Sequence, residues 1–263
     1  MNQGKIRRLK RIFRDDNRTV VVPMDHGVSI GPVKGIENMQ GIVTSLLKGG
    51  ADALVLHKGI AGLVDNGKAG LIVHLSAISN LTPNCQNKVQ VCTVQEAVRL
   101  GADAVSVHVN IGAQDECNML TILGKVAQEC EQYGMPLLAM MYPRGPKIPN
   151  EHESVAVAHA ARIGAELGAD IIKTNYTGNI VSFKQVVEGC PVPVIIAGGP
   201  KTDTAQQLLQ VVYDSVEAGG AGLSIGRNVF QHKNPTLMVK ALVSIVHYGA
   251  SVEQALKISG ENR

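Results

Sequence analysis

The sequence predicts a single (β/α)8 barrel, residues 1–263, and three observations support this fold class. The chain has 263 residues, and such barrels typically need about 250. Short apolar, β-branched runs alternate with amphipathic segments of roughly 10 to 16 residues, the pattern of repeated strand–helix units around a parallel sheet. A short glycine-containing motif also recurs where predicted helices give way to strands. We expect an N-terminal cap helix and a short extra C-terminal helix beside the barrel.

Eight strands are predicted from the apolar runs. In chain order they cover residues 20–25, 53–57, 71–76, 104–110, 136–142, 171–174, 193–198 and 222–226. Apolar residues at helical spacing follow the strands, for example Leu208, Leu209, Val212 and Val216 after the seventh. The third unit is the least regular, because residues 80–88 resemble a loop before a helix near residues 93–100. The basic segment 5–14 has amphipathic spacing and predicts the cap helix, with a solvated face, and the extra helix follows Ser251.

The recurring motif is Gly-Ala-Asp, at residues 50–52, 101–103 and 168–170, with the variant Gly-Gly-Ala at 219–221. Glycine at each position is expected to adopt the left-handed conformation that ends a helix before the chain enters the next strand. An open, doubly wound sheet is the alternative architecture. It is less attractive because no Gly-x-Gly-x-x-Gly follows the first strand.

Composition narrows the class of protein. With 45% hydrophobic residues, 18% charged residues and a net charge of +3, the chain is typical of a compact globule and gives little support to nucleic-acid or membrane-surface binding. No apolar stretch approaches the roughly 18 residues of a membrane span, and no signal-peptide pattern is present, so we expect a cytoplasmic protein. Cysteines occur at five positions, predicted to be buried, reduced and structural: Cys85, Cys92, Cys117, Cys130 and Cys190.

Lys173 is the most informative residue, because it lies within a run that otherwise predicts a buried strand. Burying an ammonium group is costly unless it is paired or neutral, and desolvation lowers the pKa of a lysine. A neutral amine in a dry pocket can attack a carbonyl, as Schiff-base chemistry requires. The alternative is a lysine that extends its amine from the strand end into solvent.

Other reactive side chains are predicted at the same end of the barrel, where the active sites of this fold lie. Asp25 and Tyr142 end the first and fifth predicted strands and would supply an acid and a phenol for proton transfer. Asp25 could instead cap a turn, and Tyr142 could be a packing residue. Segments 197–201 and 224–228 follow the last two strands, where such barrels bind phosphate, and Arg227 adds a charged fork. A phosphorylated substrate is predicted.

Histidines stand at the ends of three consecutive predicted strands: His57, His74 and His108. Imidazoles that converge on a barrel mouth can hold a divalent metal. No His-x-His or carboxylate-rich spacing accompanies them, so we favour hydrogen-bonding roles and expect no metal or cofactor.

Five segments, in this order, resemble the archaeal-type class I aldolases: residues 23–29, 140–145, 168–178, 197–202 and 226–232. The likeness extends from about residue 8 to 256, and the family's fold is a (β/α)8 barrel. It implies that Lys173 forms the Schiff base, Tyr142 donates a proton and Asp25 accepts one. It places the sugar-phosphate contacts on Asp25, His26, Gly27, Val28, Ser29, Tyr142, Pro143, Arg144, Lys173, Gly198, Gly199, Gly226 and Arg227. The departures, at Ile30 and residues 80–87, are expected outside the mouth.

The resemblance implies a transaldolase-type reaction. An imine would form with 6-deoxy-5-ketofructose 1-phosphate, hydroxypyruvaldehyde phosphate would leave, and the enamine on the lysine would add to L-aspartate semialdehyde. The product would feed 3-dehydroquinate and aromatic amino acid biosynthesis. Fructose-bisphosphate aldolase is the closest alternative, and a metal-dependent barrel enzyme or a non-catalytic sugar-phosphate sensor are more distant ones. The resemblance also implies ring-shaped homo-oligomers, often decamers, and residues 144–153 could close as a lid.

Overall fold

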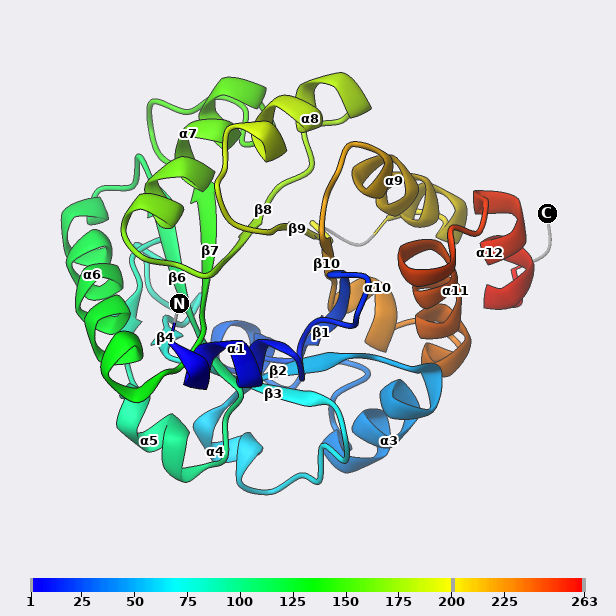
Figure 1. Ribbon diagram of the computed structural model, residues 1–263, viewed down its shortest axis with the longest axis horizontal. Coiled ribbons are helices and arrows are strands. Elements are labelled where there is room, and N and C mark those ends of the chain that lie inside the picture. The colour runs from blue at the N-terminus through cyan, green and yellow to red at the C-terminus, as the bar shows by residue number, and fades with distance from the viewer. Residues whose placement is uncertain (1, 200–201, 262–263) are drawn as a thin grey trace.

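The computed structural model describes residues 2–199 and 202–261, and it is a closed barrel of parallel strands surrounded by helices (Figure 1). The barrel strands are β1 Thr19–Pro23, β2 Ala53–His57, β3 Gly70–His74, β6 Ala104–Ile111, β7 Leu137–Pro143, β8 Ile171–Thr174, β9 Val194–Ala197 and β10 Gly222–Ser224. Neighbours in sequence are neighbours around the barrel, and β1 pairs with β10 to close it. The predicted (β/α)8 barrel is therefore confirmed. β1 and β10 end earlier than predicted, so Asp25 and Gly226 lie on the loops that follow them.

The surrounding helices are α3 Met39–Gly49, α5 Val94–Arg99, α6 Glu116–Tyr133, α7 Ser154–Glu166, α8 Ile180–Glu188, α9 Ala205–Glu217 and α11 Pro235–Tyr248. The extra C-terminal helix is α12 Val252–Ser259, which packs on α11 and α9. Short helices interrupt three loops at the carboxyl ends of strands: α2 His26–Ile30, α4 Lys58–Ala61 and α10 Arg227–Phe230. The irregular third unit contains a small antiparallel pair, β4 Ser76–Ala77 with β5 Val89–Gln90.

The glycines of the recurring motif adopt the predicted left-handed conformation, with φ of 94° at Gly50, 77° at Gly101, 98° at Gly168 and 94° at Gly219. The motif's aspartates have a role that the pattern did not reveal. Each carboxylate accepts the backbone N–H at or near the start of the preceding strand: Asp52 from Val20 at 2.7 Å, Asp103 from Leu71 at 3.0 Å and Asp170 from Leu137 at 2.9 Å. These bonds link successive strands at the amino end of the barrel.

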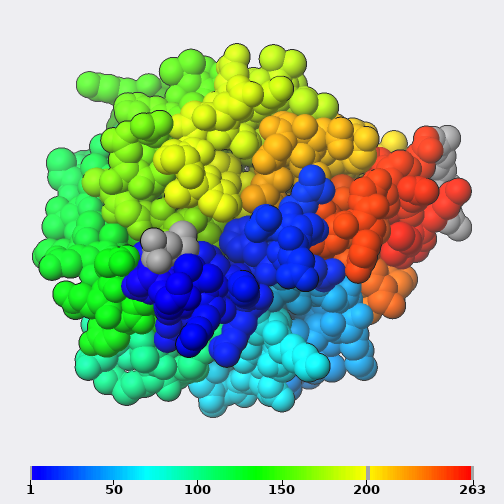
Figure 2. Space-filling view, viewed as in Figure 1, coloured from blue at the N-terminus to red at the C-terminus, as the bar shows by residue number. Residues whose placement is uncertain are grey.

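The N-terminal segment closes that amino end. Helix α1 spans Gln3–Leu9, shorter than the predicted 5–14. It ends early because the chain tightens into turns, with the Ile12 amide bonded to the Leu9 carbonyl, and Ile12 enters the barrel interior with 1% of its surface exposed. Figure 1 shows α1 lying across the end of the barrel, and Figure 2 shows the N-terminal segment across the middle of the same face.

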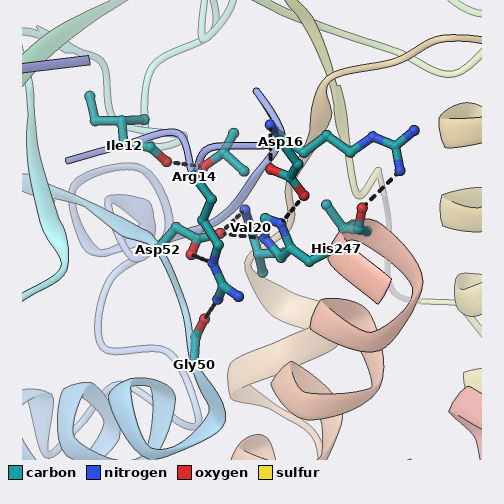
Figure 3. Close-up of polar contacts among 10 residues, drawn as sticks. Ile12, Arg14, Asp16, Val20, Gly50, Asp52 and His247 are labelled. Carbon is teal, nitrogen blue, oxygen red and sulfur yellow. Dashed lines mark hydrogen bonds and ion pairs between the residues drawn. The ribbon is translucent and has the colours of Figure 1, made fainter. Parts of the chain in front are cut away.

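The predicted solvated basic face is wrong in part, because three basic side chains pair with the motif's aspartates. Lys5 Nζ lies 3.0 Å from Asp170, Arg11 Nη1 2.8 Å from Asp103 and Arg14 Nε 2.5 Å from Asp52. Figure 3 shows the Asp52 contacts, where His247 Nε2 also lies 2.8 Å from the carboxylate. The other nitrogen of His247 lies 2.7 Å from Asp16. The segment is thus fastened to the barrel by ion pairs as well as by Ile12.

The cysteines are free, as predicted, but not all of them are buried. Cys92, Cys130 and Cys190 are buried, whereas Cys85 is half-buried and Cys117 is exposed on α6. Within residues 2–199 and 202–261, no helix combines the length and the hydropathy needed to cross a membrane.

Candidate active site

A cavity of about 510 Å³ opens at the carboxyl ends of the barrel strands. The predicted site residues that line it are Asp25, His26, Ser29, Tyr142, Arg144, Lys173, Gly198, Gly199, Gly226 and Arg227. Gly27, Val28 and Pro143 are not among the lining residues. The first two lie on the solvent side of α2, where Val28 is 44% exposed, and Pro143 is buried at the end of β7. Pro200 and Lys201, in the predicted phosphate segment, lie outside the described residues.

Lys173 lies on β8 between Met140 of β7 and Ile195 of β9. Only 6% of its surface is exposed, so it does not extend into solvent as the alternative required. Among the described residues, no carboxylate lies within the 4.0 Å of an ion pair from its amine. A buried amine that lines a cavity without a close counter-ion is a suitable carbonyl nucleophile.

Asp25 follows β1 at the N-cap position of α2, but its side chain makes no capping hydrogen bond. Its carboxylate oxygens lie 3.6 Å from His26 Nδ1 and 3.8 Å from His74 Nε2. Burial alone would raise the pKa of Asp25, but the nearby His74, His26, Lys173 and His57 bring that pKa down to about 2. Asp25 is therefore ionised at neutral pH, and its carboxylate is free to accept a proton from a bound molecule.

Two of the three strand-end histidines, His74 and His108, are hydrogen-bonded to neutral partners. His74 Nδ1 lies 2.8 Å from Ser106 Oγ, and His108 Nε2 lies 2.8 Å from Asn110 Oδ1. The pKa of His74 is lowered to about 4, chiefly by burial. The nearby His57 and Lys173 act in the same direction, and Asp25 opposes them by raising this pKa. Burial and the nearby Lys88 and Arg144 lower the pKa of His108 well below its ordinary value. Both rings are thus uncharged at neutral pH. In the described part of the chain, no three His, Cys, Asp or Glu side chains are grouped so that they could hold a metal ion.

Tyr142 is buried on β7 with its ring between two partners. The ring centroid of His108 lies 5.0 Å away, edge to face, and Arg144 Cζ lies 4.5 Å from the Tyr142 centroid. Arg144 is fixed by Glu151 at 2.6 Å, and the Glu151 carbonyl accepts a hydrogen bond from Asn175, which follows β8. Tyr142 lines the cavity, and among the described residues its hydroxyl has no hydrogen-bond partner. That geometry differs from the packing alternative, in which backbone would satisfy the hydroxyl.

The glycine-rich turns after β9 and β10 adjoin each other. Arg227 Nη2 donates to the Gly199 carbonyl at 3.1 Å and joins the two turns. Gly226 cannot carry a side chain, since a Cβ would lie 2.6 Å from the Pro23 carbonyl oxygen. Ser224 Oγ is buried, and no described residue offers it a hydrogen bond. A phosphate can be bound by a hydroxyl, by a guanidinium and by backbone N–H groups that it can approach closely.

Sequence reasoning missed several lining residues, including Ser76, Lys88 and Asn175. Ile30 and Asn80 also line the cavity, so the expectation that these two residues lie outside the mouth is wrong. Asn80 belongs to the β4–β5 segment, from which Ser76, Ala77, Ile78 and Lys88 line the cavity as well. Two-residue strands leave too short an alternation to be predicted.

The closed barrel, with a buried lysine near the end of its sixth strand that has no ion-pair partner among the described residues, defines a class I aldolase-type enzyme. Residues 19–232 match the model of the DeoC/LacD family aldolases, and the chain belongs to that family. It is 44% identical over 260 residues to 2-amino-3,7-dideoxy-D-threo-hept-6-ulosonate synthase of Halobacterium salinarum, covering 98% of this chain and 97% of the relative. 2-Amino-3,7-dideoxy-D-threo-hept-6-ulosonate synthase 1 of Archaeoglobus fulgidus is 43% identical to this chain, over 98% of this chain and 96% of the relative.

Among solved structures, a Schiff-base-forming fructose-1,6-bisphosphate aldolase is similar at 34% identity with a TM-score of 0.87. The similarity covers 92% of this chain and 100% of that chain. The predicted family and fold are therefore confirmed.

Proposed function

We propose that this protein is a transaldolase-type synthase that uses Lys173 as a Schiff base. It would join L-aspartate semialdehyde to a fragment of 6-deoxy-5-ketofructose 1-phosphate and produce 2-amino-3,7-dideoxy-D-threo-hept-6-ulosonate, a precursor in aromatic amino acid biosynthesis. The observation that carries the proposal is the buried Lys173, unpaired in a cavity shared with Asp25 and Tyr142. The identity of 44% and 43% to the two synthases, each over 98% of this chain, supports the choice of substrates.

In the first half of the reaction, Lys173 Nζ attacks the ketone carbon of the donor and a C–N bond forms. Tyr142 protonates the hydroxyl of the carbinolamine, which leaves as water and gives a protonated imine. Asp25 then takes the proton from the hydroxyl next to the breaking C–C bond. The electron pair of that bond moves into the imine, hydroxypyruvaldehyde phosphate leaves, and an enamine remains on the lysine.

In the second half, the enamine carbon attacks the aldehyde of L-aspartate semialdehyde. The proton held by Asp25 returns to the new alkoxide, and water hydrolyses the imine to release the product and restore the amine. The groups expected to hold the donor phosphate are Arg227, Ser224 and the backbone of Gly198, Gly199 and Gly226, which line one side of the cavity. The edge-to-face contact with His108 and the contact with Arg144 hold the Tyr142 ring in place.

Fructose-bisphosphate aldolase activity is the second candidate, because a solved aldolase of that type is 34% identical over most of the chain. We further propose a cytoplasmic homo-oligomer, a decamer by family resemblance, with small-molecule substrates and without a nucleic-acid or membrane partner.

Borohydride trapping tests the proposal. The protein is reduced with each ketose phosphate in turn, and the adduct is located by intact mass and peptide mapping, with Lys173→Met as the control. An adduct on Lys173 supports imine chemistry, and product formation after addition of aspartate semialdehyde separates the synthase from the aldolase. An unmodified Lys173 with both sugars contradicts the proposal.

A further inference from the structure

A second lysine in the cavity has no role in the mechanism above. Lys88 lies immediately before β5, on the β4–β5 hairpin that lines part of the cavity, and it is half-buried. Its Nζ donates to the Cys85 carbonyl at 3.2 Å. Among the described residues, no carboxylate comes within 4.0 Å of it.

The other lysine and arginine side chains that line the cavity already have a partner or a role in the proposed reaction. Lys173 forms the imine, Arg144 is paired with Glu151 at 2.6 Å, and Arg227 joins the glycine turns of the phosphate side. Lys88 is therefore the cation among the described lining residues that lacks both a carboxylate partner and a place in the reaction. A substrate with a second anionic group would supply that partner.

The hairpin holds Lys88 in place rather than leaving it on a free loop. Asn110 of β6 donates through Nδ2 to the Gln86 carbonyl, and its Oδ1 lies 2.8 Å from His108 Nε2. The Asn80 amide donates to the Ser29 carbonyl at 2.9 Å and ties the other side of the loop to α2. The loop that carries Lys88 is thus anchored to β6, whose His108 packs on the catalytic Tyr142.

Burial lowers the pKa of Lys88, with Arg144 acting in the same direction and with Cys85 and Asp25 opposing it. An anion entering beside Lys88 would relieve the cost of this burial and stabilise the ammonium form. Charge-assisted hydrogen bonds of this kind are roughly twice as strong as neutral ones.

We propose that Lys88 binds the carboxylate of the acceptor aldehyde and thereby selects L-aspartate semialdehyde. This inference rests on the proposed function. The donor brings one phosphate, for which the Arg227 side is built, and the acceptor brings a carboxylate that needs a cation elsewhere. Lys88 lies on the β3–β6 side of the mouth, whereas Arg227 follows β10. The two anions would therefore have separate binding groups.

The test measures steady-state kinetics with both substrates varied, for the wild type and for Lys88→Met and Lys88→Arg. Lys125→Met is the matched control, because Lys125 is an exposed lysine on α6 and does not line the cavity. We expect Lys88→Met to raise the KM for aspartate semialdehyde about tenfold or more and to leave the donor KM and the borohydride adduct on Lys173 unchanged. Lys88→Arg should restore part of the loss, and Lys125→Met should resemble the wild type.

An aldehyde without a carboxylate, such as butanal, provides the second comparison. Lys88→Met should use it as well as the wild type does, since no anion is to be recognised. If Lys88→Met instead raises the donor KM, Lys88 binds phosphate and the inference is wrong, while the synthase activity stands. An unchanged acceptor KM also overturns it. If the wild type fails to use aspartate semialdehyde but cleaves fructose 1,6-bisphosphate, the proposed function fails and the inference with it.

Discussion

Two lysines of this protein are almost equally buried, and replacing each with methionine should change the stability in different ways. Lys5 and Lys173 each have 6% or less of their surface exposed. Lys5 lies 3.0 Å from both Asp170 and Glu131, and these hydrogen bonds overcome the effect of burial and raise its pKa. Among the described residues, Lys173 has no such partner. Methionine has a similar length and no charge, so the variants separate pairing from packing.

Breaking a buried ion pair by removing one partner costs about 3–5 kcal/mol. The lower end of this range applies to Lys5→Met for two reasons. The Glu131 side chain is 63% exposed, and Asp170 retains its hydrogen bond from the Leu137 backbone N–H. A loss of about 3 kcal/mol lowers the Tm of a chain of this size by roughly 6–12 °C. Lys173→Met removes an unpaired buried amine, so its free energy of unfolding should stay within about 1 kcal/mol of the wild type or rise, while turnover is abolished. Thermal and urea unfolding, with the borohydride assay, would measure both. A drop for Lys173→Met as large as that for Lys5→Met would show that Lys173 is a structural cation.

Three further predictions concern the mouth of the barrel. Tyr142→Phe should lower kcat by about a hundredfold or more if the hydroxyl is a general acid, and an unchanged kcat would assign the ring to packing alone. Arg227→Ala should raise the KM for phosphorylated donors far more than for unphosphorylated analogues, whereas an equal rise would remove the phosphate assignment. The pKa of His74 is lowered from 6.5 to about 4, so stability is fully present above pH 6.5 and is lost as the pH falls toward 4, because only the unfolded chain takes up the proton. His74→Asn should remove about 3 kcal/mol of this loss, and parallel unfolding curves for both proteins between pH 7 and pH 4 would contradict the linkage.

The barrel could be predicted from the sequence because the strands are buried, mostly apolar runs and each motif glycine follows the end of a helix. The helix at residues 5–14 was predicted too long, since its apolar spacing continues through Ile12 and only tertiary packing turns the chain there. Lys88 was missed for a related reason. A lysine in a polar loop carries no local signal, and its place in the cavity depends on a bond from Asn110, 24 residues away from Gln86 in the chain.

The two ends of the barrel use the same residue type for opposite purposes. At the amino end, the aspartates of the recurring motif each accept a backbone N–H and pair with a cation, all within 3.0 Å. Their carboxylates are saturated and fasten the N-terminal segment to the strands. At the carboxyl end, the closest side-chain partners of Asp25 lie 3.6 and 3.8 Å away, although its charge is stabilised. A carboxylate kept ionised without strong hydrogen bonds can accept a proton from a substrate hydroxyl, whereas the saturated ones cannot. The sequence already separates the two residues, because Asp25 ends the first predicted strand and Asp52 stands before the second. Their partners in the fold give the physical reason why Asp25 is suited to accept a proton and Asp52 to anchor the N-terminal segment.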